Sequence, residues 1–261
     1  MVKKIFSNIY IWIILLLVYA PILWLIAFSF TTSKTIGTWT GFSFDLYVKM
    51  FQNRSMMEAL KNTLILGFSA AAISTFIGTF AAIGIFNMKN RAKKVVKAVN
   101  QIPILNADIV TAVSLMILFV TVFNVQRGLF TALLAHITFC TPYVILNVLP
   151  RLYQMNDNLY EAALDLGATP TQALFKVVIP EVLPGMLSGF MLAFTLSIDD
   201  FAITVFNIGS ANTLSTYIYK SLTKTSQPIE LRALFTVIII IIAALLIFKN
   251  IGAAKKAKEL K

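Results

Sequence analysis

The chain has 261 residues, of which 58% are hydrophobic and only 13% are charged, and its mean hydropathy is +0.82. This composition lies outside the usual range of soluble proteins and predicts an integral membrane protein. The formal net charge of +11 comes from short basic clusters beside apolar runs, which favours membrane lipids over nucleic acid as the partner of these charges.

Apolar runs of membrane-spanning length recur along the chain. The first, residues 9–30, has no charge in 22 residues, and at ~1.5 Å per residue such a helix crosses a hydrocarbon core of about 30 Å. After it, Leu46, Tyr47, Met50 and Phe51 fall at helical spacing and predict a short amphipathic helix at the interface. We predict an all-α membrane protein with a single transmembrane domain over residues 1–261 and six spans, at residues 9–30, 63–86, 102–123, 129–149, 184–208 and 233–248.

The basic residues also predict the orientation of the chain. With six spans, both termini and the polar loop of residues 150–183 lie on one side of the membrane. That side holds 14 of the 22 lysine and arginine residues, and the other side holds 8. The excess of positive charge predicts that the termini and this loop are cytoplasmic.

The loop of residues 150–183 carries the signals of two short helices. Asn158 at a predicted N-cap, Glu161 three residues later and Gly167 at a predicted C-terminal break mark the first helix. Thr169, Pro170 and Gln172 repeat the pattern and predict a second helix that ends before Pro180. Ala162 and Ala163 leave little bulk on the first helix, which suits close docking of another protein, although an ordinary surface helix can also hold two alanines.

Three aspartates fall within predicted spans. Asp199 and Asp200 interrupt the fifth span, and Asp108 lies in the first turns of the third. An aspartate at the centre of a membrane helix costs about 2.5 to 3.5 kcal/mol, so these residues need water, a cation or a basic partner. The pair can line a path for a cationic solute; alternatively, one caps a broken half-helix or pairs with a basic residue of a neighbouring subunit. Asp108 can equally serve a structural role at its helix N-terminus.

No arrangement of residues predicts catalysis or metal binding. His136 is the only histidine, and we expect it to be a hydrogen-bonded residue between helices. It has no partner spaced as a metal ligand, and the chain has no phosphate-binding loop of the GxxxxGK[ST] type. Any energy source for transport is therefore expected on another protein.

Several motifs resemble those of a known family. The spacing of Glu161, Ala162, Ala163, Gly167 and Pro180 resembles the EAA loop of ABC-importer permeases, with Val177 and Ile179 where that loop usually has isoleucine and leucine. Within that superfamily, three further stretches look like the C-type spermidine/putrescine permeases: Asp108 to Val110, His136 to Cys140 with Pro142, and Phe194 to Asp200.

The resemblance implies a type I ABC-importer permease fold whose cytoplasmic coupling helix, with Glu161, Ala162, Ala163 and Gly167, docks on an ATPase. It implies a heterodimer with a second permease subunit, two copies of a cytoplasmic ABC ATPase that hold the ATP and Mg, and an extracytoplasmic substrate-binding protein. The chain itself would need no cofactor and would be a multi-pass protein of a bacterial cell membrane. Asp108, Asp199 and Asp200 would be candidates for the polyamine path.

Three other functions remain open on the sequence alone. Importers of thiamine, phosphonate, sulfate or iron share the coupling motif, although paired acids favour a cation. An ion-coupled secondary transporter could use Asp199 and Asp200 as its ion site, but it gives no role to the capped loop and is expected to show inverted repeats. A non-transporting membrane scaffold is the third alternative, but it would not explain the aspartates within the predicted spans.

Overall fold

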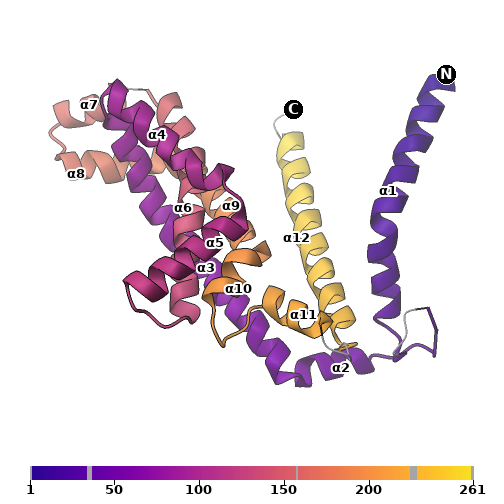
Figure 1. Ribbon diagram of the computed structural model, residues 1–261. Coiled ribbons are helices and arrows are strands. Elements are labelled where there is room, and N and C mark those ends of the chain that lie inside the picture. The colour runs from indigo at the N-terminus through magenta and orange to yellow at the C-terminus, as the bar shows by residue number, and fades with distance from the viewer. Residues whose placement is uncertain (1, 34–36, 157, 224–227, 260–261) are drawn as a thin grey trace. The chain divides into compact units, whose positions relative to one another are not determined.

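The computed structural model describes residues 2–33, 37–156, 158–223 and 228–259, and these residues form helices and no strand (Figure 1). The chain forms two compact units: residues 1–57 together with 220–261, and residues 58–219. The prediction of an all-α protein is confirmed for the described residues.

The first unit is built from three helices around an aromatic turn. It contains α1 (Val2–Phe28), α2 (Asp45–Gln52) and α12 (Leu231–Glu259), and α12 packs against both other helices. The predicted amphipathic helix is confirmed as α2, which buries Leu46 and Met50. Phe30 stacks on Phe42, with ring centroids 5.3 Å apart, and thereby joins the end of α1 to the loop before α2.

The second unit contains the elements that form the candidate sites. In chain order these are α3 (Arg54–Asn87), α4 (Asn90–Leu105), α5 (Asp108–Ile117), the π-helical segment η1 (Leu118–Val122), α6 (Leu129–Gln154), α7 (Asn158–Asp165), α8 (Pro170–Ala173), the π-helical segment η2 (Leu174–Val178), α9 (Ile179–Asp199), α10 (Ala202–Asn207) and α11 (Leu214–Leu222). The first turn of α3 and the last turn of α11 belong to the other unit.

Helix α6 forms the centre of the second unit, and small residues let its neighbours approach closely. Val144 of α6 is fully buried, and a methyl group added to Gly189 of α9 would lie 3.2 Å from its Cγ1 atom. On the other side, a methyl group on Gly78 of α3 would lie 2.7 Å from the same Cγ1. Close approach of this kind provides van der Waals contact, which holds helices together in lipid.

Four described helices are long and apolar enough to cross a membrane: Tyr10–Phe28, Arg54–Asn87, Leu129–Gln154 and the continuous helix Pro170–Asp199. A fifth span results if α4 and the helix Asp108–Val122 count as one, although they meet at an angle of 103°. The apolar helix Leu231–Ala244 is shorter. The single domain and the count of six spans therefore stay predictions.

The predicted third span, residues 102–123, contains a break: Asn106 and Ala107 are extended, and the Asn106 side-chain amide donates to Thr111 Oγ1 at 3.1 Å. One predicted boundary is wrong. The helix that starts at Pro170 does not end before Pro180 but continues into α9. The π-helical turn η2 ends two residues before this proline, and its wider backbone provides room for the ring.

The packing around Val144 predicts a difference between two glycines of one helix. Gly78→Ala forces a methyl group against Val144 and is expected to destabilise the protein by about 1–3 kcal/mol. Gly84→Ala is the matched control, because an added methyl group there meets nothing within 4 Å and the gain in helix propensity is up to ~1 kcal/mol. Thermal unfolding of the purified protein checks both; equal melting temperatures for the two variants would contradict this packing.

Candidate functional site

The loop after α6 forms a rigid pair of helices. Helix α7 ends in a tight C-cap at Gly167, whose φ is +85°, a conformation that favours glycine. The Gly167 N–H donates to the Leu164 carbonyl at 2.9 Å, and the Ala168 N–H donates to the Ala163 carbonyl at 3.0 Å. This is the Schellman pattern, so the predicted break at Gly167 is confirmed.

Helix α8 begins with the predicted cap. Thr169 Oγ1 accepts from the Gln172 N–H at 3.3 Å, and the Gln172 side chain accepts from the Thr169 N–H at 3.1 Å, with Pro170 at the first helical position. The N-cap predicted at Asn158 is wrong, because Asn158 is the first residue of α7. Its N–H donates to the Asn156 side chain at 3.1 Å.

The surface of α7 has the small and apolar character that a docking helix needs. Glu161 and Ala162 are exposed, Ala163 is half-buried, and Leu166 is 90% exposed. Sequence analysis did not identify Leu166 as a candidate docking residue. The sequence signal that could have indicated it is an apolar residue directly before Gly167 in a polar loop. An apolar side chain that protrudes this far from a rigid turn can enter a groove on another protein.

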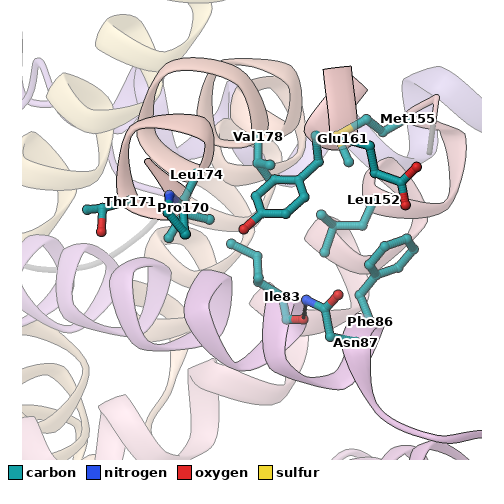
Figure 2. A pocket seen from close by; sticks show the side chains of 11 residues that line it. Ile83, Phe86, Asn87, Leu152, Met155, Glu161, Pro170, Thr171, Leu174 and Val178 are labelled. Carbon is teal, nitrogen blue, oxygen red and sulfur yellow. Dashed lines mark hydrogen bonds between the residues drawn. The ribbon is translucent and has the colours of Figure 1, made fainter. Parts of the chain in front are cut away.

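A cavity of about 610 Å³ lies beneath this pair of helices. Figure 2 shows Glu161, Pro170 and Val178 around it, together with Ile83 and Phe86 of α3. The cavity lies between α7, α8 and η2 on one side and the ends of α3 and α6 on the other.

The three predicted intramembrane acids line one open cavity of about 460 Å³ in the second unit. Asp108 begins α5, Asp199 ends α9, and both are exposed; Asp200 is half-buried. Aromatic walls come from Phe139 and Phe201. Sequence analysis brought the acids together as candidates but gave no signal for these two phenylalanines.

Asp200 has a structural task that its neighbour does not share. The helix breaks after Asp199, and the Asp200 carboxylate accepts from the N–H groups of Ile203 at 3.2 Å and Thr204 at 2.8 Å. It thereby caps α10. Capping of a broken half-helix is one of the alternatives that the sequence left open for these acids. The break also means that adjacent acids need not point about 100° apart, as they would on a regular helix.

His136 holds this break in place from α6. The side chain is fully buried, with Nδ1 2.7 Å from Ser197 Oγ of α9 and Nε2 2.9 Å from Thr204 Oγ1 of α10. Thr204 Oγ1 in turn donates to the Asp200 carboxylate at 3.0 Å. The expectation of a hydrogen-bonded histidine between helices is confirmed. In the part of the chain that the structure describes, no three His, Cys, Asp or Glu side chains gather as a possible metal site.

Comparisons with known proteins identify the family to which this helical architecture belongs. Residues 74–254 match the family model described as "Binding-protein-dependent transport system inner membrane component". The chain therefore belongs to this family of membrane permeases, and its fold is that of a type I ABC-importer permease.

Two curated relatives are similar over most of their length. The spermidine/putrescine transport system permease protein PotC of Haemophilus influenzae is 34% identical over 95% of this chain and 96% of its own. The putrescine transport system permease protein PotI of Escherichia coli is 36% identical over 85% of this chain and 81% of its own.

Solved structures agree on the fold. A bacterial ABC transporter involved in the import of alginate has a chain with a TM-score of 0.76 at 15% identity, covering 96% of this chain and 95% of that one. A chain of the methionine transporter MetNI, in an inward-facing conformation, has a TM-score of 0.60 at 18% identity, covering 78% of this chain and 97% of that one.

The His136 network predicts a loss of stability when the imidazole is removed. His136→Leu leaves the buried Ser197 hydroxyl without this partner, which costs about 1–3 kcal/mol if the hydroxyl stays unsatisfied, and it removes one hydrogen bond of the Thr204 hydroxyl, which still donates to Asp200. We expect a melting temperature several degrees lower and reduced transport. Thr138→Val on the same helix is the control, because that exposed hydroxyl bonds only within its own helix, to Leu134. A His136→Leu protein as stable as this control would show that the network is dispensable.

Proposed function

We propose that the chain is a permease subunit of an ATP-driven importer that moves polyamines, such as spermidine and putrescine, into the cytoplasm. The relatives that carry these substrates in their names match the chain over most of its length. The observation that carries the proposal furthest is the single cavity on which Asp108 and Asp199 open.

The chemistry of this cavity suits an amine. Two exposed carboxylates attract ammonium groups, and a protonated polyamine carries several along a flexible chain. The faces of Phe139 and Phe201 add cation–π attraction, which strengthens where water is excluded. An anionic cargo such as phosphonate or sulfate would meet repulsion from the same carboxylates.

The proposed assembly follows from the family. A second permease subunit completes the path, two cytoplasmic ATPase subunits bind ATP and Mg, and an extracytoplasmic binding protein delivers the solute. One of the similar solved structures is an alginate transporter in complex with a ligand-bound periplasmic protein. This chain would catalyse no covalent step, and its termini and the loop of residues 150–183 would lie in the cytoplasm, where α7 docks on an ATPase subunit.

Loss of the acids tests the substrate class. Asp199→Asn and Asp108→Asn keep the side-chain shape and remove the charge, so we expect uptake of labelled putrescine and spermidine to fall about tenfold, which corresponds to about 1.4 kcal/mol. The complete transporter in cells without other polyamine uptake provides the measurement. Asp45→Asn is the control, because Asp45 lies on α2 and pairs at the surface with Lys49, a contact of small energetic weight. Normal uptake by both cavity variants, with normal assembly, would remove the acids from the path.

Bulk on α7 tests the coupling role of the loop. Ala162→Trp places a large side chain on an exposed position, where it meets the docked ATPase and not the permease itself. We expect ATP hydrolysis by the reconstituted complex to continue while uptake falls, or the ATPase subunits to dissociate. Ala162→Ser keeps the position small and should behave as the wild type. Full, coupled transport by the tryptophan variant would contradict docking through α7.

A further inference from the structure

Helix α4 carries the densest run of positive charge in the chain. Lys89, Arg91, Lys93, Lys94 and Lys97 fall in or beside its first two turns, and residues 87–101 include no acid. The polyamine path does not use this helix, and repulsion keeps a cationic solute away from it. We therefore expect this cluster of basic residues on α4 to bind a separate, anionic partner.

Two of these lysines are directed at the body of the protein. The Lys97 ammonium lies 4.7 Å from the ring centroid of Tyr153, and the Lys93 ammonium lies 5.3 Å from that of Phe86 and 5.6 Å from that of Tyr153. Both side chains are half-buried. Within the described residues neither forms an ion pair with a carboxylate, so no acid of the described chain neutralises these two ammonium groups.

An apolar cavity of about 430 Å³ opens beside Lys97. Aliphatic side chains of α3 and α6 form its walls, among them Ile85, Ile145, Leu146 and Leu149. Residues of α4, among them Lys97 and Asn100, contribute to its polar rim. A positive rim above an aliphatic wall matches a molecule that has a negative head and a hydrocarbon tail.

The position of the cavity along α6 agrees with the depth of a lipid headgroup. The lining residues of α6 fall between Ile145 and Gln154, the last ten residues of a helix long enough to cross a membrane. Ten residues span roughly 15 Å. That distance covers the polar layer of one leaflet and the first part of its hydrocarbon, because the layer with headgroups adds only several Å to a core of about 30 Å.

We propose that this cavity binds one anionic phospholipid of the cytoplasmic leaflet. The lipid phosphate lies against the ammonium of Lys97, with Lys93 beside it, and an acyl chain follows Leu149, Leu146 and Ile145. The inference relies on the cytoplasmic placement of the loop of residues 150–183 proposed above, because the cavity lies at the end of α6 that leads into this loop, but not on the identity of the transported solute. A lipid fits better than a protein partner because the only charged residue described on the rim is the cation Lys97, while the wall continues along a helix long enough to cross the bilayer.

Lipid retention by the complete transporter tests the site. The complex of permeases and ATPases is purified in nanodiscs of phosphatidylcholine with a minor fraction of phosphatidylglycerol, and lipids bound to the released complex are counted by native mass spectrometry. We expect Lys97→Gln to retain about fivefold less phosphatidylglycerol than the wild type. Lys97→Arg should retain it, because the charge at the rim persists.

Lys94→Gln is the matched control, because Lys94 is an exposed neighbour on α4 that neither stacks on a ring nor lines the cavity. It should retain phosphatidylglycerol like the wild type. An equal loss in both glutamine variants would mean diffuse attraction without a site and would overturn the proposal. Equal retention of phosphatidylcholine and phosphatidylglycerol by the wild type would also overturn it.

A second variant tests the wall independently of charge. Leu146→Trp places a large side chain in the cavity and should displace the lipid tail, so that phosphatidylglycerol retention falls although every lysine remains. A photoreactive residue in place of Gln101, which lines the cavity from α4, should label lipid; labelling of an ATPase or permease subunit instead would assign the surface to protein docking. Polyamine uptake in the same variants, measured in cells, shows separately whether the transporter works, so failure of the lipid site leaves the proposed transport function untouched.

Discussion

The hydrogen bonds around the buried side chain of His136 are the constraint on which the second unit depends. A membrane-spanning helix that breaks inside the bilayer must find partners for its freed backbone groups within the protein. Here the Asp200 carboxylate accepts two N–H groups of the next helix, and His136 joins Ser197 before the break to Thr204 after it. Because these contacts are made, Asp199 can end α9 beside a cavity and need not be buried in the helix packing.

The same network explains why two adjacent acids differ. With Asp200 ionised, its carboxylate can only accept hydrogen bonds, so Thr204 donates to it, His136 Nε2–H donates to Thr204, and Ser197 donates to Nδ1. Each polar group in this chain has a defined donor or acceptor. Asp199 stands outside it and remains exposed. The carboxylate of Asp200 is therefore engaged in hydrogen bonds to α10, whereas Asp199 is exposed in the cavity.

Local rules made part of this structure predictable. The capping box of Thr169 and Gln172 and the left-handed Gly167 depend on residues within six positions of each other, so the sequence alone defines them. The break at Asp199 and Asp200 was also visible, because two charges within an apolar run are costly in any bilayer. Capping of a broken half-helix was one of the alternatives that the sequence left open, and the structure shows the hydrogen bonds of Asp200 to Ile203 and Thr204.

Long-range packing determined what the sequence could not show. Asn106 and Ala107 turn the chain by 103° inside an apolar run, and hydropathy has no signal for direction. Pro180 suggested a helix end, but a π turn just before it keeps the chain helical. Phe139 and Phe201 come from α6 and from the break, and their common cavity depends on how those segments pack.

The uninterrupted helix from Pro170 to Asp199 has a mechanical consequence. Its 30 residues measure roughly 45 Å, and they join the hairpin of α7 and α8 at one end to an acid of the cavity at the other. If this helix moves as a rigid rod, a tilt of about 5° applied at Pro170 displaces Asp199 by roughly 4 Å. That displacement exceeds the length of a hydrogen bond, so a movement of the hairpin can change the position of the carboxylate in the cavity without any local unfolding.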